Sequence, residues 1–286
     1  MPDKPDNGKW SGRTDGTPLM QRSLVWLLRW MPLRAVYAVM ALVVPFYMLF
    51  NRQAYRAIRS FYATRLGKGA MGSVAAVYRN YFTFGQVVVD RFAAFAGRSF
   101  LFNNDGVELF NAMAAEPDGF VVLSSHTGCY EMAGFTLNSK DKHMNALAYG
   151  GETATVMENR RRILAAHNIN MVVASDDMSH IFAINNAIAN GEIVSLPADR
   201  CYGSPKTVRC RFMGADAPFP LGPFAIAKSR QAKMLAIFVM KQSTHLYNVI
   251  VRPVDNPQHY ADTLQQVVQQ YPYQWFNHYD FFNTTQ

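Results

Sequence analysis

His126 and Glu131 are the residues whose types and spacing best suit acid–base chemistry. They lie in the stretch "VVLSSHTGCYE", where a short apolar run passes into a polar turn. A carboxylate five positions after an imidazole can accept a hydrogen bond from one ring nitrogen and hold the other toward a substrate. The pattern therefore predicts a general base, His126, that Glu131 orients. A solvated turn histidine, and a glutamate favoured by the dipole of a following helix, would explain the same residues without catalysis.

The three cysteines, Cys129, Cys201 and Cys210, offer weaker chemistry. Cys129 could act as a nucleophile with His126 as its base, as in a thioesterase, but no second element marks it and a buried structural thiol is the favoured interpretation. The spacing of the cysteines and His126 lacks the paired ligands of a zinc site, so no metal is predicted. An odd, sparse set of cysteines indicates a reducing compartment.

Alternating strands and helices must position the candidate base. Short apolar runs predict strands at 120–123, 145–149, 170–174, 192–197, 234–240 and 247–254. Helical patterns separate them at 54–64, 70–95, 106–114, 129–138, 153–167, 178–190, 221–230 and 258–270. This order predicts an α/β fold with a mixed, largely parallel sheet flanked by helices. His126 then follows the carboxyl end of a strand, where the active sites of such sheets lie.

The N-terminal region has the features of a membrane anchor. Residues 35–50 carry no charge, but a helix of that length spans only about 24 Å against a hydrocarbon core of about 30 Å. Pro45 would bend it, and the nearby Trp26 and Trp30 suit the headgroup level. We expect residues 20–60 to form an interfacial or tilted spanning anchor, a buried core helix being the alternative. The first nineteen residues are polar and show no pattern of a cleavable signal peptide. We expect two units: residues 1–60, with the polar lead and the membrane-associating helices, and residues 61–286, the α/β domain.

Charge and aromatic residues favour a membrane over nucleic acid. The net charge is +8, half of the residues are hydrophobic, and arginines flank the apolar N-terminal run. The tail "YPYQWFNHYDFF" is rich in aromatic residues, but no Lys or Arg lies between Tyr260 and Gln286 to make a nucleic-acid stacking platform. We expect the tail to pack against the N-terminal anchor, the membrane interface or the core.

The stretch "SSHTGCYE" resembles the H-x-x-x-x-[D/E] block of bacterial lysophospholipid-type acyltransferases, in particular the late acyltransferases of lipid A biosynthesis. The segments "ANGEIVSLPADRCYG" and "TVRCRFMGADAPFPLGPFAIAKSRQAKMLAIFV" are similar to the second half of that branch. The N-terminal and closing segments are also similar, so the resemblance covers nearly the whole chain. The ordered set is far more specific than the histidine block alone.

The resemblance implies that His126 is the general base, that Glu131 orients it, and that Asp199 and Arg200 line the site and help to hold the acceptor. Basic residues after the strand ends, Arg200, Lys206, Arg209 and Arg211, would suit an acceptor phosphate or an acidic carrier protein. The alternation from Thr207 to Met213 also fits an edge strand with one wet face. In "ENRRR" (158–162), an exposed helical face is the simpler interpretation.

The implied activity is the transfer of a fatty acyl chain from acyl carrier protein or acyl-CoA to a hydroxyl or amine of a lipid or glycolipid. We expect it at the cytoplasmic face of a bacterial inner membrane, with no metal, no resident cofactor and no nucleic-acid partner. Acyl transfer from a thioester needs a base and no covalent enzyme intermediate. The alternative is a catalytically silent lipid-binding or scaffold protein on the same fold.

Overall fold

A computed structural model of the chain describes residues 28–135, 142–148, 168–175, 177–201 and 206–282, together with Trp26, Leu137, Ser139, Arg161, Leu164 and Ala165. The polar lead and most of the predicted helix at 153–167 lie outside these residues. So do most of the "ENRRR" stretch and the last four residues of the chain.

A seven-stranded sheet forms the centre of the fold, with the strand order β1-β9-β8-β2-β5-β3-β4. Its strands are β1 (Leu101–Asp105), β2 (Phe120–Ser124), β3 (Met144–Ala148), β4 (Ile169–Val173), β5 (Ile193–Pro197), β8 (Met234–Lys241) and β9 (Leu246–Val254). All neighbouring strands are parallel except β8 and β9. A separate antiparallel hairpin pairs β6 (Thr207–Phe212) with β7 (Ala215–Pro220).

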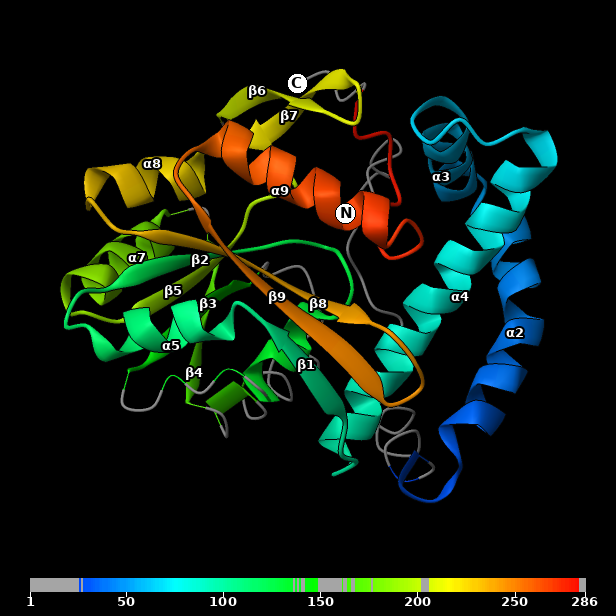
Figure 1. Cartoon of the computed structure of the whole chain (residues 1–286), viewed down its shortest axis with the longest axis horizontal. Helices are drawn as coiled ribbons and strands as arrows, with labels where there is room; N and C mark the ends of the chain where they lie inside the picture. Colours follow the sequence, from blue (N-terminus) through cyan, green and yellow to red (C-terminus); the bar gives the residue numbers. More distant parts are fainter. Residues whose placement is uncertain are drawn as a thin grey trace, which may run out of the picture.

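Helices cover both faces of the sheet (Figure 1), and an apolar core lies beneath them on each face. Because strand side chains alternate between faces, Val121 and Leu123 of β2 join one core and Phe120 and Val122 the other. The first core is closed by α7 (Ser179–Ala189), α8 (Gly222–Ser229), α9 (Pro257–Gln270) and the β6–β7 hairpin. The second is closed by α4 (Ala70–Phe95), α5 (Val107–Ala115) and the 3-10 helix η1 (Tyr130–Phe135). Every residue of β2 is therefore buried, as in a central parallel strand.

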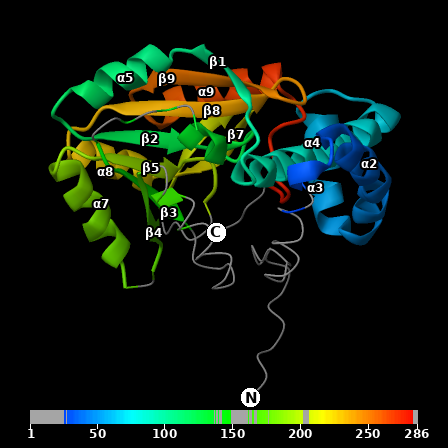
Figure 2. The same ribbon diagram turned by 90° about the horizontal axis from the view of Figure 1, so that it is seen from below.

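Helices α2 (Leu33–Phe50) and α3 (Arg52–Thr64) lie beside α4 at one side of the sheet (Figures 1 and 2). Their shared core includes Val44 of α2, Ile58 and Tyr62 of α3, and Val77 and Tyr81 of α4. Among the described residues, α2 is the one helix long and apolar enough to cross a membrane, and most of its surface is exposed.

The sequence-based prediction of the fold class is confirmed, and the predicted strands coincide with β2, β3, β4, β5, β8 and β9. The structure adds β1 and β7. β1 has a largely exposed "LFNND" sequence without the apolar run that marks a buried strand. The predicted helix at 129–138 is a 3-10 helix over Tyr130–Phe135.

The aromatic tail packs both against the N-terminal helices and into the core. Tyr273 lies beside Tyr62 of α3, and Trp275 contacts Phe61 with ring centroids 4.8 Å apart. Phe281 is buried in the core above the sheet. The tail thereby joins α3, α4 and the core of the sheet.

Candidate active site

The site is formed where two neighbouring parallel strands end. β2 and β5 pair in register so that Ser124 lies opposite Pro197. The amide of Ala198 then donates to the carbonyl of Ser124 at 2.9 Å, which carries the pairing one step beyond the strands. His126 and Asp199 each follow their strand by two residues, and the register brings them together at the same edge of the sheet.

Asp199 holds His126 through two hydrogen bonds. One carboxylate oxygen accepts from the backbone N–H of His126 at 2.7 Å, and the other lies 2.8 Å from ring atom Nδ1. Asp199 is almost fully buried, whereas about a quarter of the His126 side chain is exposed. Burial alone would raise the pKa of the Asp199 carboxyl, but the His126 imidazole, these donors and Arg200 hold that pKa below its ordinary value. An ionised Asp199 can only accept a hydrogen bond, so Nδ1 carries the ring proton and donates to Asp199. In this tautomer, Nε2 is the nitrogen that can accept a proton.

The structure shows which carboxylate lies at Nδ1 of His126. Glu131 was expected to orient the imidazole, and Asp199 to bind the acceptor. Asp199 lies at Nδ1, while Glu131 forms an ion pair with Arg91 of α4 at 2.7 Å and lines the cavity beside His126, so the role of Glu131 stays a prediction. This placement is topological, since Asp199 directly follows β5, the strand beside β2, whereas Glu131 lies in η1 and pairs with α4. Although burial opposes the charge of Arg91, the Glu131 carboxylate raises the pKa of its guanidinium above the ordinary value.

The C-terminal tail braces the loop that carries His126. The amide of Phe276 donates to the His126 carbonyl at 2.9 Å, and the amide of Gly128 donates to the Gln274 carbonyl at 2.8 Å. Thr127 and Trp275 form an isolated antiparallel bridge between these bonds. Arg200 donates to the Phe276 carbonyl at 2.6 Å, so Arg200 supports this brace.

Gly128 lets the loop turn tightly against β8. Its φ is +52°, and a Cβ built on it would lie 2.1 Å from the carbonyl oxygen of Val239. The next amide, of Cys129, donates to that same carbonyl at 2.8 Å. Only glycine fits this position, because a side chain would both clash and require left-handed backbone.

A mainly apolar cavity opens beside His126. Tyr130 and Glu131 line it near the loop, together with Ser124 and Ser125. Farther along the sheet it is lined by Val122, Leu137, Met144, Ala146, Ile169, Met171 and Ile237. Because the strand register places Ala146 and Met171 below the strand ends, the cavity runs from the imidazole back along β5, β3 and β4. Its apolar lining suits a hydrocarbon chain.

The other predicted binding residues lie apart from this cavity. Of the described residues, those that line it do not include Lys206 or Arg211. Lys206 is exposed just before β6, and Arg211 is exposed on β6, 3.6 Å from Asp216. The alternation of exposed Arg209 and Arg211 with buried Cys210 and Phe212 is that of a strand with one wet face.

The thiols are poorly suited to nucleophilic attack. Burial raises the pKa of Cys129 to about 12, so its thiol stays protonated near neutral pH. Burial also raises the pKa of Cys201 to about 11, and that of Cys210 to about 11. Within the described part of the chain, no group of three or more His, Cys, Asp or Glu side chains is placed to hold a metal ion.

Sequence reasoning missed the residues that brace the site from elsewhere in the chain. Gln274 and Phe276 act through backbone groups, which leave no residue-type signal. Arg91 lies in α4, far from His126 in the sequence, and its residue type gave no sign that it would pair with Glu131. His278 lies near Arg200 and His126, and burial followed by these two charges lowers the pKa of His278 to about 3. The only sequence signal for this brace was the dense aromatic tail.

The fold and the site define an α/β domain with a carboxylate-held imidazole beside an apolar cavity, an arrangement suited to acid–base chemistry on a lipid-like substrate. Residues 82–276, more than half of the chain, match the family described as bacterial lipid A biosynthesis acyltransferase, and the chain belongs to this family. It is therefore an acyltransferase. Among the curated proteins compared, no match to the chain was found.

Proposed function

We propose that this acyltransferase moves a fatty acyl chain from a thioester to a hydroxyl or amine of a lipid acceptor, with His126 as the general base. The observation that carries the proposal is the pair of hydrogen bonds from His126 to the buried Asp199, at the mouth of an apolar cavity. Asp199 fixes the tautomer and orientation of the ring, which is what a general base requires.

The proposed reaction balances with one proton relay. Nε2 of His126 takes the proton of the acceptor as its oxygen or nitrogen attacks the thioester carbonyl. The tetrahedral intermediate then collapses, the carbon–sulfur bond breaks, and the thiolate takes the proton from the imidazolium. Asp199 stabilises this imidazolium through Nδ1. These reaction steps require no resident cofactor and no covalent enzyme intermediate.

The cavity accounts for binding of the acyl chain. An acyl chain that lies along β5, β3 and β4 places its carbonyl near His126 if the chain enters from the loop side. Glu131 lines the same cavity, and its ion pair with Arg91 holds its carboxylate there. Glu131 thus acts beside Asp199 in the proposed site.

The donor is proposed to be acyl carrier protein or CoA, and the acceptor a membrane lipid or glycolipid. Exposed Lys206, Arg209 and Arg211 form a basic edge that suits an acidic carrier protein or a phosphate. Both thioesters are soluble cytoplasmic compounds, so the site would face the cytoplasm at the inner membrane. Replacing Arg209 and Arg211 with Glu should raise KM for acyl carrier protein with little change in kcat, if this edge receives the donor.

The test is the transfer of a labelled acyl chain by wild-type protein and by His126→Ala. The donors are acyl carrier protein and acyl-CoA, the acceptors are extracted membrane lipids, and mass analysis identifies the lipid that gains a chain. We expect wild-type turnover and at least ~100-fold less in His126→Ala, with unchanged circular dichroism. Turnover retained in a folded His126→Ala protein would overturn the mechanism. A silent lipid-binding protein would bind acyl chains without turnover in either form.

A further inference from the structure

The N-terminal helices carry an apolar face and a set of positive charges outside the catalytic site. Exposed side chains on α2 recur at Val39, Leu42, Val43, Phe46 and Phe50, a spacing that places them along one face of the helix. Leu42 is 73% exposed and Phe50 is 86% exposed. Trp26 and Trp30, just before α2, are also exposed. An exposed apolar face of this extent indicates a surface that binds another protein or a membrane.

The charge around this face is entirely positive. Residues 28–89 contain eight Lys and Arg residues and no Asp or Glu. Arg52, Arg56 and Arg59 are exposed at i, i+4 and i+7 of α3, so they lie along one face of that helix. Tryptophans, an apolar helix face and adjacent arginines are complementary to an anionic lipid surface.

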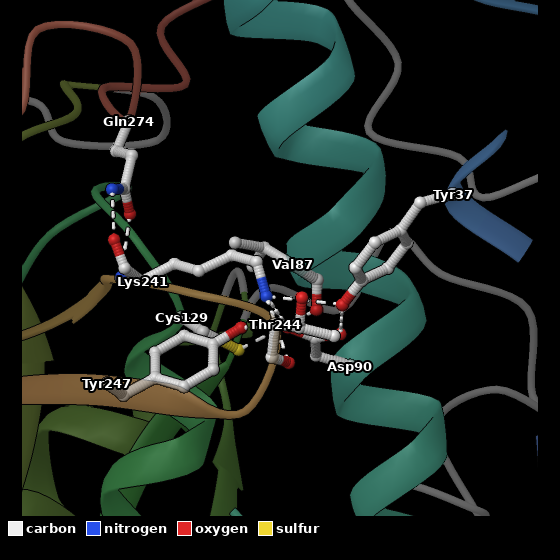
Figure 3. Close-up of polar contacts among 8 residues, drawn as sticks. All are labelled: Tyr37, Val87, Asp90, Cys129, Lys241, Thr244, Tyr247 and Gln274. Carbon is white, nitrogen blue, oxygen red and sulfur yellow. Dashed lines mark hydrogen bonds and ion pairs between the residues drawn. The ribbon is translucent and has the colours of Figure 1, made fainter. Parts of the chain in front are cut away.

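The opposite face of α2 is fixed to the catalytic domain. α2 runs along α4, with Tyr47 packed on Tyr81 and the Ala41 carbonyl accepting from Tyr78 at 3.1 Å. At the other end Tyr37 donates to Asp90 of α4 (Figure 3). These contacts cover α2 along most of its length.

Asp90 lies at the centre of a buried polar cluster. It also accepts from Tyr247 of β9 and forms an ion pair with Lys241 at the end of β8. Burial raises the pKa of the Asp90 carboxyl and lowers that of the Lys241 ammonium, and each charge offsets part of the other's burial cost. Figure 3 shows Tyr37, Lys241 and Tyr247 converging on Asp90 from three separate elements. The cluster therefore pins α2 to the sheet that carries the site.

A docked α2 cannot also cross a bilayer. The part of α4 beside it carries Arg79, Asn80 and Asp90, and Asn80 holds the carbonyls of Tyr273 and Trp275 in the tail. Crossing would take these polar groups and the brace of the His126 loop into hydrocarbon, where unpaired polar groups are costly.

We infer that α2 and α3 form a lateral docking surface for an anionic lipid bilayer, on which α2 lies in the membrane plane while it stays packed on α4. The inner face of α2 is held by Asp90, the outer apolar face enters the lipid, and the α3 arginines bind anionic headgroups. This orientation keeps the domain at the surface, where the acceptor lipid would reach the site. The inference does not depend on the chemistry at His126.

A disulfide between α2 and α4 tests the docked arrangement. A Cβ at Gly85 would lie 3.3 Å from Cγ of Met40, so Met40→Cys with Gly85→Cys places two thiols within bonding reach. In a Cys201→Ser background, flotation with vesicles of phosphatidylcholine and phosphatidylglycerol compares the oxidised and reduced forms. We expect binding of the two forms to agree within about twofold. Loss of binding on oxidation, with recovery on reduction, would overturn the inference because α2 would have to leave α4.

Surface variants test the lipid chemistry. Replacing Arg52, Arg56 and Arg59 with Gln should weaken binding to phosphatidylglycerol vesicles by ~tenfold or more at low salt, and wild-type protein should bind phosphatidylcholine alone much more weakly. Leu42→Gln with Phe46→Gln should also weaken binding, whereas Phe182→Gln, an equally exposed residue on α7, should not. Equal binding by wild type and both surface variants would exclude this surface. The His126→Ala protein should bind like wild type, which separates this inference from the proposed reaction.

Discussion

Replacing Asp199 with Asn tests the central feature of the site. Asp199 is buried and accepts two N–H groups of His126, one from the backbone and one from Nδ1. Asn has nearly the same shape but only one oxygen, so it can satisfy only one of these donors. If its NH₂ group faces the ring, Nδ1 must become the acceptor, and the ring proton moves to Nε2. His126 then has no free Nε2 lone pair to act as a base, and the substitution leaves no void because Asn and Asp have nearly the same volume.

The size of the effect follows from this geometry. A positioned general base contributes about 10²–10⁴ to the rate, which corresponds to about 3–5 kcal/mol of transition-state stabilisation. We expect kcat to fall by that factor. Because the Asp199 carboxylate is turned toward His126 and is nearly inaccessible, KM for the acceptor should stay within about twofold.

Steady-state acyl transfer at several acceptor concentrations measures this split between kcat and KM. Glu131→Gln is the matched control, since it also removes one charge beside the cavity but breaks the ion pair with Arg91. Glu131→Gln should lower the stability of the protein, and it should lower kcat less than Asp199→Asn does. An unchanged kcat with a raised KM in Asp199→Asn would refute the assignment and return Asp199 to acceptor binding. A folded Glu131→Gln protein with the larger loss of kcat would make Glu131 the orienting residue.

The same residue predicts a pH dependence of stability. The pKa of Asp199 in the folded protein lies below the ordinary value of 3.8. The stabilisation of the folded protein by ionised Asp199 is therefore complete above pH 3.8 and is lost as the pH falls through the folded-state pKa. Thermal unfolding at neutral pH and in strong acid should show a steeper acid loss in wild type than in Asp199→Asn. Parallel curves would mean that this carboxyl titrates alike in the folded and unfolded chain.

Three further predictions concern the loop, the thiols and the cavity. Gly128→Ala should lower the melting temperature and abolish acyl transfer, because the new Cβ clashes with a backbone carbonyl. The control Gly67→Ala, at φ +61° with open space around it, should lower the free energy of unfolding by only about 1–2 kcal/mol and keep activity. Equal losses of melting temperature in the two variants would contradict the clash. Iodoacetamide at pH 8 should leave Cys129 unmodified until denaturant is added, and Cys201→Ser protein so treated should keep its activity; mass spectrometry that finds native Cys129 labelling with matching inactivation would favour a cysteine nucleophile. Ala146→Phe should narrow the cavity and shift preference toward shorter acyl donors, and an unchanged chain-length profile would place the chain elsewhere.

The residues themselves determined most of the fold. Uninterrupted apolar runs such as Phe120–Leu123 identify buried parallel strands, because a strand covered on both faces has no polar alternation. The helical periods between them require crossover connections, which indicate a parallel sheet. The same pattern predicted that His126 follows the end of a strand, because His126 comes shortly after the apolar run Phe120–Leu123 in the chain. The uncharged run at 35–50 and the arginines beside it also predict a membrane anchor at residues 20–60, and this stays a prediction.

Only the tertiary structure decided which carboxylate meets the imidazole. Glu131 is near His126 in the chain, and Asp199 is 73 positions away, but β5 lies directly beside β2 in a strand order that does not follow the sequence. Local spacing carries no information about which strands become neighbours, because that depends on how the helices close both faces of the sheet. The tail brace and the Asp90 cluster depend on the same assembly, since each joins segments that are brought together only when the sheet and its covering helices have packed.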